Sequence, residues 1–367
     1  MRIAVIHHSN DFSNDYAAYL SALLDETAVE NNYVVKDYHR LLFDKEVLTG
    51  ENIVLHIVIN AENSFAIRYW YGLKLPSIFK KCAIEKVICQ YGILTSSRIA
   101  QILVLPDTAL LSPNKKMLPW QKIAAKNVKK NIAAAQTVIT YSQHAKNETE
   151  ELNGNNAKKI AVFPYTANLL FKPLEWHDKL YIKSRFAENK EFFAAVLPHD
   201  DEKVFTELLK AFSKFKKWQQ SSMQLLLLPK EDAFAETIHE KLETYKYRQD
   251  VKLVNDADKK EIADIFAAAY ALIHVSPQDA DLLPVAAALQ SATPVIAFST
   301  ESLQEYCGNA VILITEPGYE LLGDQLTQLY KNETQRAEMS EAAIKRTEIF
   351  QQKEHAEKLW QLLNEKL

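Results

Sequence analysis

The residues with the clearest chemical potential form a polar loop between an apolar strand and a helix in the last third of the chain. Residues 271–275 are apolar, residues 276–281 (SPQDAD) are polar, and residues 284–289 favour a helix. Loops at the carboxyl ends of parallel strands bind anions when a helix begins after them, because unpaired N–H groups and the helix dipole point at the same spot. The loop is therefore a candidate phosphate site.

Carboxylates, however, crowd this candidate site. Five of them follow two predicted strands: Asp200, Asp201, Glu202, Asp279 and Asp281. If both strands share one parallel sheet, close acidic pairs would repel a phosphate by on the order of 1 kcal/mol each. Asp281 is also placed to cap the helix that begins near Leu283. These acids are interpreted either as solvated loop residues and caps or as oxygen ligands that share a divalent ion with His199.

Length and composition indicate two ordinary domains in a cytoplasmic protein. The 367 residues exceed a single core and suit two domains of roughly 150 to 200 residues each. A net charge of −4 argues against general nucleic-acid binding. We find no signal-peptide pattern and no apolar stretch of about 18 residues, so no membrane span is expected. The three cysteines, Cys82, Cys89 and Cys307, are expected to be buried thiols.

Glycine is scarce, with seven residues in the whole chain. Glycine lets the backbone approach a phosphate closely, so a nucleotide site built on glycine loops would lack its usual residues here. The sequence also has no G-x-S-x-G, Walker or G-x-G-x-x-G pattern and no zinc-ligand spacing. We therefore predict neither a metal site nor a bound cofactor.

Strands and helices alternate along the chain, which predicts parallel sheets covered by helices on both faces. In the first half we predict strands over 2–7, 53–59, 86–89, 101–105, 137–141 and 159–163, with helices over 16–26, 67–81 and 117–134. In the second half we predict strands over 191–196, 223–228, 251–254, 271–275, 295–297 and 310–314. Helices between and after these strands are predicted over 203–218, 233–244, 259–268, 318–330, 333–347 and 351–366. Residues 176–190 are interpreted as the connection between the two halves.

From residue 274 onward the chain resembles retaining GT-B glycosyltransferases of family four, the glycosyl transferases group 1 type. That family carries roughly S-x-x-E-G-F-G-L-P-x-x-E-A-x-A-x-G-x-P-V-I at this point. The residues in register are Ser276, Leu283, Pro284, Ala288, Pro294, Val295 and Ile296. Asp279 stands at the first glutamate of the pattern, Ala287 at the second, and Leu282 at a loop glycine. Residues 203–212 (KVFTELLKAF) match a helix whose lysine contacts the donor diphosphate in the family, which points to Lys203.

The first half carries phrases similar to the family in the same order. They are YWYGLKLP at 69–76, QILVLPD at 101–107, VITYS at 138–142 and FKP at 171–173. Where the family usually has His-Asp, this chain has Pro106 and Asp107, so the histidine that faces the sugar is replaced. His7 and His8 end the first strand on the side that the resemblance assigns to the acceptor. Packing or capping of a strand end is the alternative interpretation of these histidines.

The resemblance implies an α/β protein of the GT-B fold, with two Rossmann-like doubly wound parallel-sheet domains facing across a cleft. We expect an acceptor-side domain over 1–175, a donor-side domain over 176–350, and a last helix over 351–367 packing back on the first domain. The implied catalytic residues are Asp279 and Lys203. The implied donor-binding residues are Lys203, Ser276, Asp279, Leu282, Leu283 and Glu305. The implied acceptor-side residues are His7, His8 and Asp107.

The implied function is retaining transfer of a sugar from a nucleotide-sugar donor to a saccharide or lipid-linked acceptor, in polysaccharide or glycoconjugate biosynthesis. Lys203 would neutralise the leaving diphosphate, and Asp279 would hold the donor hexose. Because several donor-site positions are replaced, a second hypothesis is a catalytically silent GT-B subunit that binds a partner in glycan assembly. A sugar-nucleotide epimerase of the same fold is a third.

A basic segment stands out in the otherwise acidic chain. Residues 114–132 contain six lysines with Trp120, Ile123 and Val128 between them. Such a segment indicates either peripheral contact with the inner face of an anionic membrane or the solvated face of an ordinary helix. If the protein is active, the expected partners are a nucleotide-sugar and a saccharide or lipid-linked acceptor. A membrane surface is a partner under the first interpretation of residues 114–132, and no nucleic acid is expected.

Overall fold

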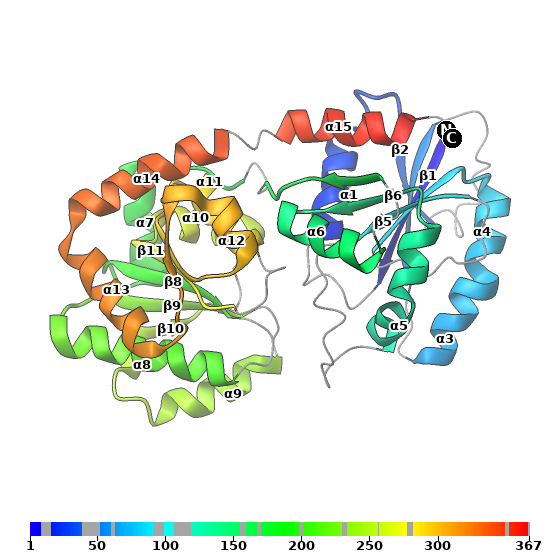
Figure 1. Cartoon of the computed structure of the whole chain (residues 1–367). Coiled ribbons are helices and arrows are strands. Elements are labelled where there is room, and N and C mark those ends of the chain that lie inside the picture. Colours follow the sequence, from blue (N-terminus) through cyan, green and yellow to red (C-terminus); the bar gives the residue numbers. More distant parts are fainter. Residues whose placement is uncertain are drawn as a thin grey trace. The chain divides into compact units, whose positions relative to one another are not determined.

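The computed structural model describes thirteen stretches of the chain: 1–8, 16–38, 52–59, 63–90, 99–105, 119–154, 159–166, 170–197, 202–229, 233–255, 257–276, 282–348 and 352–365. The chain packs as two compact units (Figure 1). Unit 1 comprises Met1–Tyr165 and Gln352–Leu367, and unit 2 comprises Thr166–Gln351.

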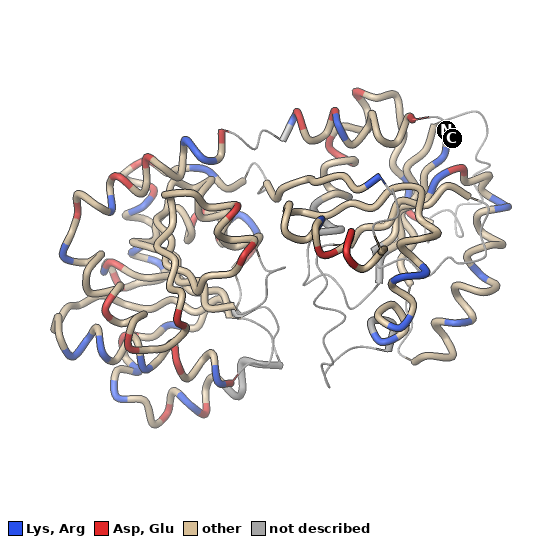
Figure 2. Tube along the Cα trace, viewed as in Figure 1, with Lys and Arg blue, Asp and Glu red and all other residues tan. Residues whose placement is uncertain are grey.

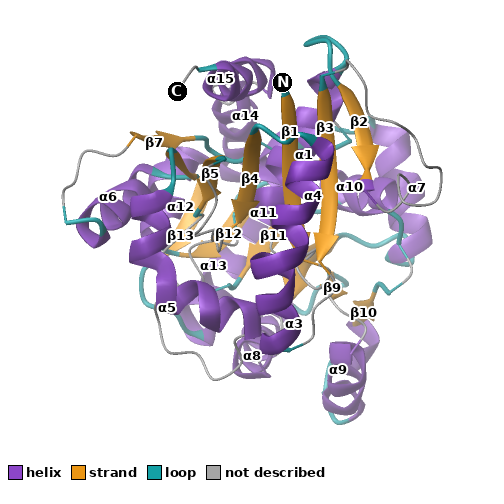
Figure 3. Ribbon diagram, turned by 90° about the vertical axis from the view of Figure 1, so that its right-hand side faces the viewer, coloured by secondary structure: helices purple, strands orange, loops and turns teal. Residues whose placement is uncertain are grey.

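A parallel sheet forms the centre of unit 1 (Figure 3). Its described strands lie in the order β2-β3-β1-β4-β5-β6-β7. They are β1 (Arg2–His8), β2 (Val34–Asp37), β3 (Ile53–Ile59), β4 (Lys86–Gln90), β5 (Ala100–Val104), β6 (Thr137–Thr140) and β7 (Lys159–Val162). β1 pairs with β3 on one side and β4 on the other, with Ile3 opposite both Val54 and Lys86. β2 escapes sequence-based prediction because VVKD is short and mostly exposed at the edge of the sheet.

Helices cover both faces of this sheet. They are α1 (Tyr16–Ala28), α3 (Ser64–Tyr69), the π-helix η1 (Trp70–Lys74), α4 (Leu75–Cys82), α5 (Pro119–Ala134), α6 (Gln143–Leu152) and α15 (Gln352–Asn364). Ala4 and Ile6 of β1 join one apolar core with residues of α3, α4 and α5, while the alternate residues Ile3 and Val5 are also buried. Successive strand residues point to opposite faces, so both faces are covered, as the apolar strands predict.

The predicted helix over 67–81 begins earlier and is not regular. Asn63 caps α3 by accepting a hydrogen bond from the Ala66 backbone N–H at 2.9 Å. The chain then passes through the wider turn of η1 into α4, which ends at Ala83 in the left-handed region, φ 50°. A π-helical turn inside an α-helix is uncommon and frequently marks a functional surface.

Helix α15 packs against α1 in unit 1. The Trp360 indole N–H donates to the Thr27 hydroxyl at 2.8 Å, and its ring lies 4.5 Å from that of Tyr33. At the carboxyl end of α15 the buried ammonium of Lys86 donates to the carbonyls of Leu363, at 2.6 Å, and Glu365, at 2.7 Å. A cation at a helix carboxyl terminus satisfies unpaired carbonyls and complements the helix dipole.

A second parallel sheet forms unit 2, with described strands in the order β10-β9-β8-β11-β12-β13. The strands are β8 (Phe192–Leu197), β9 (Gln224–Pro229), β10 (Val251–Leu253), β11 (Ala271–His274), β12 (Val295–Phe298) and β13 (Val311–Ile314). The longer helices are α7 (Trp176–Phe186), α8 (Glu202–Gln219), α9 (Ala233–Glu243), α10 (Lys259–Ala268), α11 (Leu283–Gln290), α12 (Glu301–Cys307), α13 (Tyr319–Lys331) and α14 (Glu333–Glu348). Two 3-10 turns, η3 (Arg248–Asp250) and η4 (Gly308–Ala310), precede β10 and β13. The predicted α/β class with two Rossmann-like sheets is confirmed.

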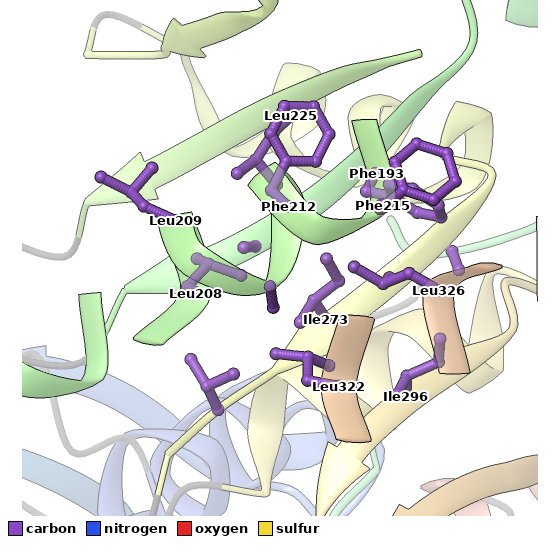
Figure 4. Packing of buried hydrophobic residues seen from close by; sticks show 14 of the residues in the cluster. Phe193, Leu208, Leu209, Phe212, Phe215, Leu225, Ile273, Ile296, Leu322 and Leu326 are labelled. Carbon is purple, nitrogen blue, oxygen red and sulfur yellow. The ribbon is translucent and has the colours of Figure 1, made fainter. Parts of the chain in front are cut away.

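The core of unit 2 lies between the sheet, α8 and α13 (Figure 4). Phe212 and Phe215 of α8 and Phe193 of β8 are fully buried, and the Phe193 and Phe215 rings meet edge to face at 5.3 Å. Leu322 and Leu326 of α13 complete the cluster. The sequence of α8 has one apolar face. Burial of that face against the sheet fixes the amino-terminal turn of α8 relative to β8.

Residues 176–190 do not form the simple connection expected from their charge. Their first part is helix α7, which packs against α10 within unit 2. Ile182, Lys183 and Ala187 are buried, and the other charged side chains are exposed or half-exposed, which gives the segment its linker-like composition. The expectation was wrong because the few buried residues of α7, one of them a lysine, give no periodic apolar signal.

Replacing Lys86 by methionine should loosen α15. The change removes two charge-assisted hydrogen bonds from a buried site, so we expect a loss of about 1–3 kcal/mol in the free energy of unfolding of unit 1. Urea denaturation and faster hydrogen exchange along α15 would measure it. The matched control is Lys159→Met, which breaks an exposed ion pair with Glu365 and should cost less than about 1 kcal/mol. Equal effects of the two substitutions would contradict the capping role.

The docking of α15 should also weaken in acid. Burial lowers the pKa of His355, on α15, from its ordinary value of 6.5 to about 4. Between these values the unfolded chain binds a proton that the folded chain does not, so stability falls as the pH drops from 6.5 to 4, by up to about 3 kcal/mol. His355→Gln should flatten this slope in urea denaturation curves across that range. An unchanged slope would show that other groups cause it.

Candidate functional site

The strand order of unit 2 reverses between β8 and β11. β8 pairs with β9 on one side and β11 on the other, and all three strands are parallel. The chain moves outward from β8 through β9 to β10, then returns to begin the other half at β11. In open α/β sheets, ligands bind outside the carboxyl ends of the strands at such a reversal, because the two following loops diverge there. The segments after β8 and β11 therefore define the candidate site.

Lys203 follows β8 and lies in the first turn of α8. Its side chain is exposed, while Phe205, Leu208 and Phe212 on the other face of the helix are buried. Because that apolar face anchors α8 on the sheet, the exposed side of the first turn faces solvent next to the carboxyl end of β8. Lys203 thus lies at the sheet edge that follows β8, and its role in donor binding stays a prediction.

Glu202, the neighbour of Lys203, does not act as an uncompensated negative charge. The Lys241 ammonium of α9 lies 2.9 Å from its carboxylate, and this hydrogen bond lowers the pKa of Glu202. Lys241 also donates to the Thr206 hydroxyl at 2.7 Å. Of the five carboxylates expected to crowd the site, Glu202 is the one in the described residues. Asp200, Asp201, Asp279 and Asp281, together with His199, lie outside them.

The segment after β11 brings Ser276 and the amino end of α11 to the same sheet edge. Ser276 is buried at 2% exposure, and His274, which ends β11, is equally buried. Leu282 occupies the N-cap position of α11, and its apolar side chain accepts no hydrogen bond. Pro284 lies in the first turn, where its missing N–H costs nothing. The helix cap expected at Asp281 falls outside the described residues, and the N-cap position itself belongs to Leu282.

Helix α11 is held firmly behind this loop. Its residues from Pro284 to Leu289 are all buried. The side-chain amide of Gln290 donates to the Phe171 carbonyl at 2.9 Å, and the Thr293 hydroxyl donates to the Phe266 carbonyl at 2.7 Å. The Phe171 and Phe266 rings meet edge to face at 5.6 Å. The burial of α11 and these contacts at and after its carboxyl end hold the helix against its neighbours.

Glu305 belongs to the next element of the same edge. It lies on α12, which follows β12, and its side chain is exposed. Thr300 caps α12 by accepting from the Leu303 N–H at 3.2 Å. The Arg346 guanidinium of α14 donates to the carbonyls of Glu305, at 2.7 Å, and Tyr306, at 2.5 Å. Arg346 therefore holds α12 at its carboxyl end.

Four of the implied donor-site residues, Lys203, Ser276, Leu282 and Leu283, thus follow the two strands at the reversal, and Glu305 follows the neighbouring strand. Asp279 lies outside the described residues, so its role stays a prediction. On the acceptor side, His7 and His8 form the last two residues of β1, opposite Val58 and Ile59, and their side chains fall outside the described part. Asp107 also lies outside it.

Several residues that support the site were not predicted from the sequence. Lys241 and Arg346 act on residues 39 and 40 or 41 positions away, so no local pattern reveals them. Thr300 carries a local signal, because a threonine directly before a helical segment is a common N-cap.

Within the described ranges, no group of three or more His, Cys, Asp or Glu side chains could hold a metal ion. None of the described helices is long and apolar enough to cross a membrane.

Comparison with known proteins adds a family and a fold. The sequence model of the family described as Glycosyl transferases group 1 matches residues 178–346. A comparison with curated proteins gives no match. The chain is similar in structure to sucrose-phosphate synthase from Thermosynechococcus elongatus, with 14% identity, a TM-score of 0.73, and coverage of 99% of this chain and 98% of that one.

Two further solved structures are similar over their whole length. HepE of Anabaena, solved in complex with UDP and glucose, has 14% identity and a TM-score of 0.70, with 99% of each chain covered. WaaG, a glycosyltransferase involved in lipopolysaccharide biosynthesis, has 12% identity and a TM-score of 0.74, with 100% of each chain covered.

The two parallel sheets and the strand reversal in unit 2 define a protein of the GT-B class. Within that class, residues 178–346 match the sequence model of the glycosyl transferases group 1 family. The predicted resemblance to that family and the predicted GT-B fold are confirmed.

Replacing Arg346 by methionine should destabilise unit 2 by about 1–3 kcal/mol, because two carbonyls at the end of α12 lose charged donors. Hydrogen exchange should rise along α12 more than along β12. The control is Lys345→Met, a neighbour on the same helix, which should change stability by less than about 0.5 kcal/mol. Unchanged exchange in α12 would show that Arg346 does not hold it.

Proposed function

We propose that this protein transfers a sugar from a nucleotide-sugar donor to a saccharide or lipid-linked acceptor, with retention at the anomeric carbon. One observation carries the proposal. In the unit that matches the family, Lys203, Ser276 and the α11 amino end follow the two neighbouring strands at which the sheet order reverses. A cation and a helix amino terminus at that point suit the diphosphate of a nucleotide-sugar.

Lys203 supplies the positive charge for the leaving diphosphate. Its exposed ammonium stands on the first turn of α8, where the helix dipole adds to its field. The Glu202–Lys241 pair, at 2.9 Å, supports this role because Lys241 offsets the nearest described carboxylate. Charge that develops on the departing phosphate oxygens would be stabilised by such a fixed cation.

The loop before α11 completes the proposed donor site. Backbone N–H groups around Leu282 and Leu283 would bind the leaving group, since the N-cap side chain does not occupy them. Asp279 would hold the hexose, as the family pattern implies. The buried Ser276 hydroxyl would help to fix the loop at its start. No glycine occurs at these loop positions, so the proposed site depends on side chains and helix ends more than on close backbone approach.

A uridine nucleotide is the first donor to test, because the similar HepE structure contains UDP and glucose. On the acceptor side the proposal keeps His7, His8 and Asp107 as candidates. It also keeps a peripheral membrane contact through residues 114–132, of which the described part carries Lys122, Lys126, Lys129 and Lys130 on exposed positions of α5.

Titration with UDP, GDP and ADP, with and without a divalent metal, should raise the melting temperature for the nucleotide of the donor. Lys203→Ala should weaken that binding by about tenfold or more, since a hydrogen bond to a charged group contributes about 1.5–3 kcal/mol. The matched control is Lys210→Ala, on the same helix and paired with Glu207 at 3.0 Å, which should leave binding unchanged. A melting temperature that none of the nucleotides moves would favour the silent-subunit hypothesis instead.

A further inference from the structure

The most exposed apolar side chains of unit 1 include three from one helical segment. Phe65, Tyr69 and Leu73 on α3 and η1 are 82%, 51% and 67% exposed. They are spaced four residues apart, so they lie along one side of the helix. Exposure of such a stripe to water is unfavourable, because large apolar side chains are more stable when buried. We name these three residues the apolar stripe.

The π-turn keeps the apolar stripe straight. In an α-helix each step of four residues advances about 40° beyond a full turn, so an i, i+4 row drifts around the axis. The wider turn of η1 (Trp70–Lys74) holds more residues per turn and rotates the row back between Tyr69 and Leu73. Trp70 and Tyr71 of the same turn are buried and anchor it on the core. The irregular turn therefore keeps Leu73 in line with Phe65 and Tyr69 at the surface.

Cations flank the apolar stripe, and carboxylates are absent from its helices. Between Ser64 and Cys82 the sequence has four basic residues, Arg68, Lys74, Lys80 and Lys81, and no Asp or Glu. Arg68, Lys80 and Lys81 are exposed, and the Lys74 ammonium lies 3.7 Å from the Trp70 ring centroid. Among the described residues, none of the four forms an ion pair with a carboxylate. Arg68, Lys80 and Lys81 thus present positive charge at the described surface.

Helix α5 extends the same charge pattern. It packs against α3, and its sequence from Pro119 to Ala134 also lacks Asp and Glu. Its four lysines, Lys122, Lys126, Lys129 and Lys130, are all exposed. In Figure 2 the traces of α3, α4 and α5 carry basic positions with no acidic ones. Eight basic residues and an apolar stripe on adjoining helices contrast with the net charge of −4 of the whole chain.

We propose that the apolar stripe and the flanking cations bind the surface of an anionic lipid bilayer. Phe65, Tyr69 and Leu73 would enter the boundary between headgroups and acyl chains, with Arg68, Lys80 and the α5 lysines on the lipid phosphates. Aromatic and aliphatic side chains on one face, with Lys and Arg beside them, are the combination that interfacial helices use. Each cation near an anionic surface adds attraction that falls off within a Debye length.

A lipid surface fits these observations better than an acidic protein segment does. A protein partner would need a shape that matches the row of protruding side chains, whereas acyl chains adapt to any apolar protrusion. The π-turn residue Gly72, next to the apolar stripe, borders open space, because a methyl group added at its Cα would meet no other atom within 4 Å. The described surface is thus open at Gly72. This inference rests on the membrane contact proposed above for residues 114–132 and extends it to α3 and η1. Its test is separate from nucleotide binding by unit 2.

The decisive experiment is flotation with lipid vesicles. The full chain should bind vesicles of phosphatidylglycerol mixed with phosphatidylcholine and should bind pure phosphatidylcholine vesicles much less. Raising the salt from about 0.1 M to about 1 M should weaken binding, because the Debye length falls from about 10 Å to about 3 Å. The triple variant Phe65→Gln, Tyr69→Gln, Leu73→Gln should reduce the fraction bound by roughly tenfold or more. Glutamine is a good helix former, so the melting temperature should stay close to that of the parent.

A matched control lies in unit 2. Trp176, Leu180 and Tyr181 of α7 are 68%, 43% and 60% exposed, which is a comparable apolar surface among charges of both signs. Replacing all three by glutamine should leave vesicle binding unchanged. Equal loss in the two triple variants would overturn the proposal, because it would indicate a non-specific effect of surface hydrophobicity. So would parent protein that fails to float with anionic vesicles.

A fluorescent label can test whether the apolar stripe itself enters the lipid. The native cysteines, Cys82, Cys89 and Cys307, are all buried, so a cysteine introduced by Leu73→Cys can be labelled selectively with an environment-sensitive dye. Anionic vesicles should shift its emission to shorter wavelength, and brominated lipids should quench it. The same label at Leu180→Cys should show neither effect. If the Leu73 label stays in water while the protein floats, or if the triple variant changes only self-association in sedimentation, the apolar stripe is not the lipid contact.

Discussion

Every strand pair that the structure describes is parallel, and this constraint decides where chemistry can occur. Parallel strands are covered by helices on both faces, so most of their buried residues are apolar. Polar residues that can meet a ligand gather mainly where the chain leaves a strand. In unit 2 the reversal between β8 and β11 brings two such exits together, and Lys203, Ser276 and Leu282 all follow from it.

Much of this arrangement could be predicted from the sequence, because apolar runs of five to seven residues alternate with amphipathic helices. The fold class and most strands follow from such local patterns, whereas Lys203 was singled out by the family resemblance of residues 203–212. β2 was missed because its exposed VVKD carries no burial signal, and α7 because its charged face resembles a linker. The roles of Lys241 and Arg346 could not be predicted for a different reason. Their contacts join residues about 40 positions apart, and only the packing of the helices on the sheet brings these residues together.

The distribution of charge separates two tasks within one chain. At the described edge of unit 2, Lys203 stands beside Glu202, whose charge Lys241 already offsets, a balance suited to one anionic group of defined size. Unit 1 instead spreads cations over three adjoining helices without acidic residues, a balance suited to an extended anionic surface. The scarcity of glycine agrees with this division. In both units the positive potential comes from side chains and helix ends more than from backbone N–H groups that approach a ligand closely.

The packing of α15 on unit 1 affects how the protein folds during its synthesis. Thr27 and Trp360 form a hydrogen bond across 333 positions, and Lys86 reaches Leu363 across 277. A ribosome therefore releases all of unit 2 before the residues that complete unit 1 have been made. Domains fold as they emerge from the ribosome, so unit 2 can complete its fold before unit 1 does. Until α15 has been made, the patch of α1 and β4 that it contacts stays uncovered. In the cell that patch is a natural target for chaperones during translation.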